Sequence, residues 1–323
     1  MQCLRTLRAA CLLTVALSLV ACASLMPEKP SSNTYSCGQL DIRVAETDAG
    51  LLGIDFADQR LLLKSAESAS GALYVAPDNP DTRFWSKGAR ASLTVDGERY
   101  PECLEPGAIE DPFEARGNEP FWRVRVAAGQ LTLERPYEST PPLRLDAQLE
   151  QSDRHGRTFV AEGSGVRVKL RVARQLCNDS MSGSQYPAQA RLTINGDVYQ
   201  GCGGDPVRLL RGVEWVVETV DGLAVMERSQ MTVRFLDGQR VVGAASCNRY
   251  AGTYRLTGEG LDVDSIASTR MACVPSLMKQ EERFLKLLGQ IRAFRIGKHG
   301  ELNLLTLDGR TIVAHRNSGG SIP

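Results

Sequence analysis

The segment Val166-Arg167-Val168-Lys169-Leu170-Arg171-Val172 alternates strictly between apolar and basic residues. A period of two sends successive side chains to opposite faces of a β-strand, so this segment predicts a strand with one buried and one solvated face. The same alternation recurs in residues 122–126 and 191–194, and the dipeptide Asn195-Gly196 that follows favours a hairpin turn. Residues 112–207 are therefore predicted to form an antiparallel β domain.

The part of the chain that precedes this domain carries short apolar stretches separated by turn residues. Residues 40–44, 53–56, 61–63 and 91–95 are such stretches, and Asp96-Gly97 is a hairpin dipeptide. Evenly spaced strands of this length are typical of a small closed barrel. We predict one over residues 35–105.

The last part of the chain, residues 209–315, combines strands with one helix. Residues 231–235 and 302–307 are predicted strands, and Pro275-Ser276 precedes a helical period in which Ser276 is the predicted N-cap. The residues that share one face of the period are Leu277, Glu281, Phe284, Leu285, Leu288 and Ile291. The predicted fold class of the whole chain is mainly β and multidomain, with an α+β domain at the end.

Composition excludes several classes of function. The 323 residues include 38 Lys and Arg against 38 Asp and Glu, so the chain lacks the basic surplus that a nucleic-acid-binding protein needs. The three histidines, His155, His299 and His315, lie in turn contexts or near the polar C-terminal tail, and no hydrolase, nucleotide-binding or metalloprotease motif accompanies them. We therefore expect no enzymatic activity, no metal site and no cofactor.

The N-terminus has the order of features found in exported lipoproteins. Arg5 and Arg8 precede an uncharged run over residues 9–20, which is too short to span a bilayer. The run ends in Leu19-Val20-Ala21-Cys22, which resembles the bacterial lipobox. The resemblance implies a signal peptide over 1–21, acyl chains on Cys22 and a lipidated tether over 22–34. The implied location is the cell envelope, at the outer membrane and facing the periplasm, because Ala23 follows instead of Asp.

Six cysteines remain after the signal peptide and the lipidated residue are set aside. In an export compartment they are expected to form disulfides, and six cysteines allow 15 pairings. The simplest pairing is sequential because each bridge then lies within one of the three segments. Its members are Cys37 with Cys103, Cys177 with Cys202, and Cys247 with Cys273.

Two motifs in the first segment carry a resemblance to a known family. Ser70-Gly71-Ala72-Leu73-Tyr74 and Phe84-Trp85-Ser86-Lys87-Gly88 lie between Cys37 and Cys103. The set resembles the membrane-bound inhibitor of c-type lysozyme (MliC) family, whose members are eight-stranded antiparallel barrels on a lipid anchor. The family commonly has Arg where this chain has Leu73, so a peripheral contact of the family is expected to be weaker here.

The resemblance implies a protein partner, c-type lysozyme, and a way to block it. Lysozyme cleaves glycan with two carboxyl groups that face each other across a cleft. By resemblance, Lys87 would meet these carboxyl groups and Ser70 would hydrogen-bond one of them. Gly71 and Gly88 would permit close approach, and Tyr74 would hold the Ser70 loop. Residues 35–105 contain seven Lys and Arg and twelve Asp and Glu, a net charge of −5 that would attract the typically basic c-type lysozymes.

The second segment offers one candidate pair without a catalytic set. Its pieces Gly117-Asn118-Glu119-Pro120-Phe121-Trp122 and Gly201-Cys202-Gly203 resemble a bacterial envelope domain of unknown activity. Asn118 and Glu119 either bind a ligand or shape a turn before a buried Phe121/Trp122 pair. The second interpretation is the one we favour.

The third segment resembles the META domain, also called HslJ-like. The resemblance rests on Ala245-Ser246-Cys247-Asn248-Arg249-Tyr250 and Ser268-Thr269-Arg270-Met271-Ala272-Cys273. The polar residues of these motifs either line a binding site or satisfy main-chain groups around the Cys247–Cys273 bridge, and we favour the latter. The alternative function for the whole chain is a non-enzymatic envelope stress or adhesion lipoprotein that acts through this domain.

Overall fold

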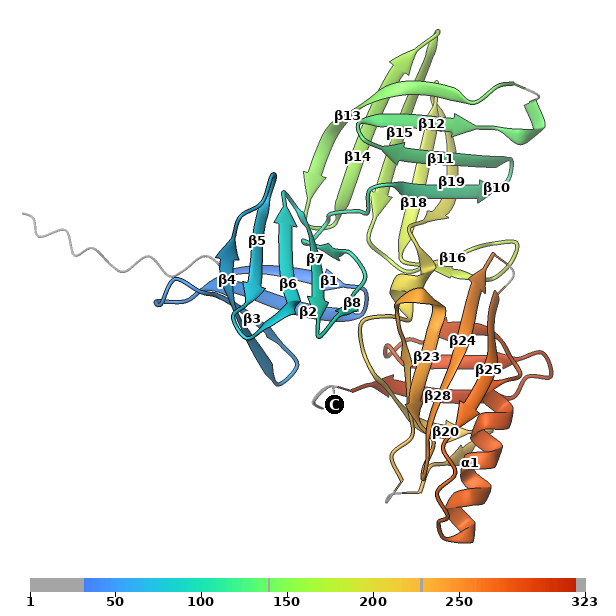
Figure 1. Cartoon of the computed structure of the whole chain (residues 1–323). Helices are drawn as coiled ribbons and strands as arrows, with labels where there is room; N and C mark the ends of the chain where they lie inside the picture. The colour runs from blue at the N-terminus through green and yellow to red at the C-terminus, as the bar shows by residue number, and fades with distance from the viewer. Residues whose placement is uncertain (1–31, 139, 227–228, 259, 318–323) are drawn as a thin grey trace, which may run out of the picture. The chain divides into compact units, whose positions relative to one another are not determined.

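The computed structural model describes residues 32–138, 140–226, 229–258 and 260–317. The predicted signal peptide, the lipidated Cys22 and most of the predicted tether lie outside the described residues. The tether's last three residues are described, and they belong to a strand that begins at Ser32, three residues before the predicted boundary. The described residues form a mainly β fold with a single α-helix near the C-terminus, as the sequence predicts (Figure 1).

The first barrel is built by antiparallel strands that follow one another around the sheet. The strands are β1 (Ser32–Cys37), β2 (Leu40–Glu46), β3 (Leu52–Phe56), β4 (Gln59–Ala66), β5 (Ala72–Ala76), β6 (Asn79–Lys87), β7 (Arg90–Val95), β8 (Glu98–Arg99) and β9 (Cys103–Leu104). The sheet order is β6-β5-β4-β3-β2-β1-β9-β7-β8, and an additional pairing of β6 with β7 closes all strands but β8 into a ring. Ile54, Leu63, Phe84 and Leu93 fill its core. The predicted Asp96-Gly97 turn joins β7 to β8, with both residues at positive φ.

The second barrel is a closed ring in which the first strand, β10, pairs with the last, β19. Its strands are β10 (Phe113–Asn118), β11 (Phe121–Ala127), β12 (Gln130–Glu134), β13 (Leu143–Asp153), β14 (Gly156–Gly163), β15 (Val166–Ala173), β18 (Ala188–Ile194) and β19 (Asp197–Gly203). In β15 the side chains of Val168, Leu170 and Val172 are buried, which is the face that the alternation predicts. A short pair, β16 (Cys177–Asn178) and β17 (Gln185–Tyr186), and a 3-10 turn at Pro136–Glu138 complete this domain.

The third domain consists of one antiparallel sheet and a helix that packs against it. Its strands are β20 (Trp215–Val220), β21 (Leu223–Ala224), β22 (Thr232–Phe235), β23 (Arg240–Ala244), β24 (Arg249–Thr257), β25 (Gly260–Ser268), β26 (Ile291–Ile296), β27 (Leu302–Thr306) and β28 (Thr311–Arg316), with 3-10 turns at Pro206–Leu209 and Asp237–Gln239. The helix α1 (Pro275–Leu288) buries Phe284, Leu287 and Leu288 in the sheet's core.

The N-cap of the helix lies two residues before the predicted one. Pro275 occupies the first turn and Val274 is the N-cap, without a side-chain capping bond, so Ser276 is not the cap. The reason is that the fixed φ of proline already suits the first helical turn, where a missing N–H costs nothing. The helix ends at Leu288, and Ile291 therefore lies in β26 instead of on the helical face.

Each of the three domains contains one disulfide. The disulfides join Cys37 to Cys103, Cys177 to Cys202 and Cys247 to Cys273, which is the sequential pairing. Each bridge closes a loop within one domain, and such loops typically add about 3–4 kcal/mol of stability.

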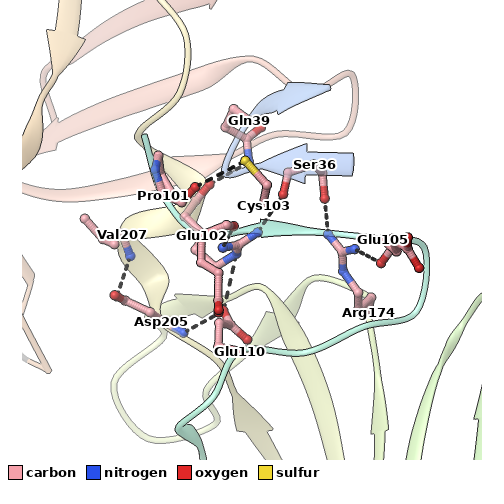
Figure 2. Close-up of polar contacts among 11 residues, drawn as sticks. Ser36, Gln39, Pro101, Glu102, Cys103, Glu105, Glu110, Arg174, Asp205 and Val207 are labelled. Atoms are coloured by element: carbon pink, nitrogen blue, oxygen red, sulfur yellow. Dashed lines mark hydrogen bonds and ion pairs between the residues drawn. The ribbon is translucent and has the colours of Figure 1, made fainter. Parts of the chain in front are cut away.

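The segment that follows the second barrel returns to the first barrel through Arg208. The Arg208 side chain is 6% exposed and forms an ion pair with Glu110 at 3.3 Å. Its guanidinium also donates to the main-chain oxygens of Glu102 at 2.6 Å and Ser36 at 3.0 Å. Arg174 of the second barrel adds a 2.6 Å hydrogen bond to the Ser36 hydroxyl (Figure 2). One buried cation thus ties together the ends of β1 and β9 and the linker between the two barrels.

Candidate functional site

Lys87 stands at the tip of a tight hairpin. It is the last residue of β6 and pairs with Arg90, the first residue of β7, so Gly88 and Ala89 form a two-residue turn. Gly88 has φ +60°, a conformation that glycine adopts without strain. Lys87 is exposed, and its ammonium group makes no ion pair or hydrogen bond with any described residue. The hairpin therefore presents an uncompensated positive charge to solvent.

Ser70 lies in the loop between β4 and β5, and its main chain is held from two sides. The indole Nε1 of Trp85 donates to the Ser70 carbonyl oxygen at 2.8 Å, and the Ser68 hydroxyl donates to the same oxygen at 2.7 Å. Ser70 is exposed, and within the described chain its hydroxyl has no hydrogen-bond partner. The loop is anchored through its main chain, so the hydroxyl is left available.

Gly71 brings the Ser70 loop against the Lys87 hairpin. It has φ +68°, and a Cβ atom there would collide with the carbonyl oxygen of Ser86 and would touch the Trp85 indole. Only glycine fits such a contact. Because Gly71 adjoins Ser70 and Ser86 adjoins Lys87, the structure places these two free polar side chains on neighbouring loops.

Tyr74 lies deeper than the two loops. It is half-buried in β5, opposite Phe84, and packs against the core of the first barrel. The hydrogen bond that holds the Ser70 loop comes from the indole of Trp85 and not from Tyr74, the residue that the resemblance implies for this role. The chemistry of tryptophan could have indicated this bond from the sequence. A partly buried indole N–H normally finds an acceptor, and the carbonyl of the Ser70-Gly71 turn is one.

Arg90 fixes the far side of the hairpin. It forms ion pairs with Glu102 at 3.6 Å and with Asp111 at 3.1 Å. Burial raises the pKa of the Glu102 carboxyl, and the positive charge of Arg90 opposes this rise. The charge of Arg90, on the β7 side of the turn, is thus compensated, in contrast to the charge of Lys87 on the β6 side.

In the second barrel, Asn118 acts within the structure of a turn. Asn118 and Phe121 are the last pair of the β10–β11 hairpin, so Glu119 and Pro120 form its turn. The Asn118 side-chain amide donates to Asp179 at 2.9 Å and to Ser180 at 3.1 Å. The turn interpretation fits these contacts. The aromatic pair is buried only in part, because Trp122 is 3% exposed whereas Phe121 is half-buried against Tyr137.

In the third domain, Asn248 and Thr269 serve main-chain groups. Asn248 is 6% exposed, and its amide donates to Glu281 on α1 at 2.8 Å. Its carbonyl accepts from the Thr269 hydroxyl at 2.8 Å and the Met271 N–H at 2.7 Å. All of these groups surround the Cys247–Cys273 bridge. The contacts fit the interpretation favoured from the sequence, in which the polar residues satisfy main-chain groups around this bridge. Arg249 and Arg270 are exposed, and Arg249 joins this network through its main-chain N–H, which donates to the Thr269 hydroxyl at 3.2 Å.

His155 lies in the second barrel, whereas His299 and His315 lie in the third domain. The main-chain N–H groups of His155 and His299 donate to Asp153 and Glu301 within their turns, and His315 lies in β28. Among the described residues there is no group of three or more His, Cys, Asp or Glu side chains placed to hold a metal ion.

Comparison with protein families assigns two of the three domains. Residues 35–101 match the family described as membrane-bound lysozyme-inhibitor of c-type lysozyme, and residues 208–319 match the META domain. The chain carries an MliC domain and a META domain. The matched ranges agree closely with the predicted domains at 35–105 and 209–315, and the barrel between them has no family name.

Comparisons with whole proteins add little. No match was found among curated proteins. A solved NMR structure of a protein from Burkholderia xenovorans is 26% identical, covers 34% of this chain and 85% of its own, and has a TM-score of 0.29. A crystal structure of BBS1N in complex with ARL6DN is 9% identical, covers 91% of this chain and 94% of its own, and has a TM-score of 0.17. At these TM-scores neither likeness supports an inference about fold or function.

The MliC domain relates this chain to a family of membrane-bound inhibitors and thereby to the cell envelope. Within the described residues, no helix has both the length and the apolar character needed to span a bilayer.

Proposed function

We propose that this protein inhibits c-type lysozyme by inserting Ser70 and Lys87 of its MliC domain into the catalytic cleft. The observation that carries the proposal is that two adjoining loops present a hydroxyl and an ammonium group, neither of which has a partner among the described residues. A glycosidase cleft holds two carboxyl groups about 5–10 Å apart, and a cation beside a hydroxyl is the complement of such a pair. The protein acts as an inhibitor and not as an enzyme.

The position of Lys87 suits this role energetically. Its ammonium group is exposed before binding, so no ion pair with a described residue has to break when it meets a carboxylate. Close charge pairs in protein interfaces contribute about 1.5–7 kcal/mol in double-mutant cycles. The tight turn and the Trp85 bond fix both loops beforehand, which reduces the conformational entropy lost on binding.

A lipid on Cys22 would hold the inhibitor at the outer membrane, facing the periplasm, where it meets an incoming lysozyme. Residues 22–31 would then serve as the tether. Replacement of Cys22 by Ala tests the anchor: the protein is expected to move from the membrane fraction to the soluble fraction, with inhibitory strength unchanged. A variant that stays in the membrane fraction would contradict it.

The inhibition itself is tested by glycan hydrolysis with a c-type lysozyme, titrated with the soluble protein that lacks residues 1–22. Lys87→Ala is expected to weaken inhibition by about 100-fold, which corresponds to roughly 2.7 kcal/mol. Ser70→Ala is expected to weaken it less, because it removes a single hydrogen bond. Lys64→Ala, which removes an exposed positive charge from β4 of the same barrel, is the control and should inhibit like the parent. Equal inhibition by Lys87→Ala and the parent would exclude the proposed mechanism.

A further inference from the structure

A cavity of about 350 Å³ lies beside the Lys87 hairpin and is lined by residues of both barrels. Ala89 and Arg90 of the hairpin form one wall. The opposite wall includes Leu149 and Phe159 of the second barrel. Because residues of the hairpin and of the second barrel line the same cavity, these two parts of the chain face each other across it.

Contacts on both sides of the cavity fix this relationship. Arg90, which faces Lys87 across the hairpin, forms an ion pair at 3.1 Å with Asp111 in the linker to the second barrel. Ile109 of the same linker belongs to the core of the second barrel. Gly107 approaches the main chain of Asp153 so closely that no side chain would fit. The wall of the second barrel is therefore part of the surroundings of Lys87.

A protein–protein interface centred on Lys87 would cover an area much larger than the hairpin. Stable interfaces cover about 800 Å² on each partner, which corresponds to a disc with a radius of about 16 Å. Ala89 is two residues from Lys87, so their Cα atoms are separated by at most about 7 Å. A footprint centred on Lys87 thus reaches across the cavity to the second barrel.

The wall that it reaches carries an exposed apolar side chain. Leu149 of β13 is 53% exposed and pairs across the strand with Phe159 of β14, which is half-buried. An apolar pair beside a charged tip fits an interface in which the contacts around a central anchor exclude water from it.

We infer that the second barrel is part of the lysozyme-binding surface, with Leu149 and Phe159 contacting the body of the enzyme while Lys87 enters its cleft. The inference rests on the proposed function of the MliC domain and adds a second contact to it. It also gives the unnamed barrel a role, namely to widen the footprint of the inhibitor.

The test replaces Leu149 by Lys, which puts a charge in place of the apolar contact. The matched control is Val198→Lys, because Val198 is 45% exposed on β19, which lies opposite β13 in the ring of the same barrel. Leu149→Lys is expected to weaken inhibition about tenfold, and Val198→Lys should inhibit like the parent. Thermal unfolding of both variants verifies that the barrel is intact.

The outcomes separate the two proposals. If the parent inhibits, Lys87→Ala does not, and Leu149→Lys inhibits like the parent or better, the second barrel is not part of the footprint and only this inference fails. If the parent does not inhibit, both proposals fail. Equal weakening by Leu149→Lys and Val198→Lys would also overturn the inference, because the effect would then be general charge repulsion.

Discussion

The indole N–H of Trp85 donates a 2.8 Å hydrogen bond to the carbonyl oxygen of Ser70. The two residues are 15 positions apart: Ser70 lies in the loop between β4 and β5, and Trp85 lies in β6, two residues before Lys87. Trp85 pairs with Leu73 across β5 and β6, so its ring is set by the sheet, and the sheet in turn positions the loop. The geometry of the candidate site is thereby coupled to the register of the barrel.

Replacement of Trp85 by Phe is expected to keep the barrel folded and to loosen the Ser70 loop. The phenyl ring retains most of the apolar contact but lacks the N–H, and a hydrogen bond of this kind contributes about 0.5–1.5 kcal/mol. Inhibition of lysozyme should weaken by about three- to tenfold. The measurement is the inhibition constant beside a thermal melt of the variant. Unchanged inhibition would show that the bond does not position Ser70.

Gly71 and Gly88 are expected to differ in their tolerance of alanine. Both have positive φ, so either substitution introduces backbone strain of about 1–2 kcal/mol. At Gly88 the added Cβ meets no atom within 4 Å, whereas at Gly71 it collides with the Ser86 carbonyl. Gly71→Ala should therefore lose clearly more stability in urea denaturation and should separate the two loops. A larger loss for Gly88→Ala would refute the packing argument.

The fold could be predicted largely from local patterns. The alternation in residues 166–172 specified a strand with its correct buried face, and Asp96-Gly97 and Asn195-Gly196 marked hairpin turns that the structure confirms. These features depend on the period of the side chains and on φ at two turn residues, both of which are local properties of the sequence. The helix start was displaced because proline at its first turn outweighs the nearby serine.

The contacts between domains could not be predicted in the same way. Arg208 reads in the sequence as an ordinary charged residue, yet it is buried among Glu110, Glu102 and Ser36. Its partners are up to 172 positions away, and no local period encodes them. The same reason explains why the cavity beside the Lys87 hairpin became visible only in three dimensions.

Replacement of Arg208 by Met is expected to destabilise the protein by about 3–5 kcal/mol. The substitution leaves the Glu110 carboxylate, which is 16% exposed, and two main-chain oxygens without their donor. Arg208→Lys keeps the charge but lacks the planar fork of the guanidinium, so its stability should lie between that of the parent and that of Arg208→Met. Arg191→Met, at an exposed position of β18, is the control. The measurement is denaturant unfolding, and equal stability of the Met variants would contradict the assigned role.

Asp179 is expected to make the second barrel sensitive to acid. Burial by itself raises the pKa of this carboxyl, but hydrogen bonds from Ser182 and Asn118 outweigh burial and hold the pKa below the ordinary value of 3.8. A carboxyl whose pKa is lowered on folding stabilises the folded state above its unfolded pKa, and this stabilisation is lost as the pH falls through the folded pKa. Asp179→Asn should therefore be less stable than the parent by about 1–3 kcal/mol at pH 7. The difference in stability should shrink as the pH falls below about 3.8.

Urea denaturation at several pH values measures this difference. The control is Asp197→Asn, because Asp197 is exposed. A difference that stays constant down to acid pH would mean that Asp179 does not act through its charge.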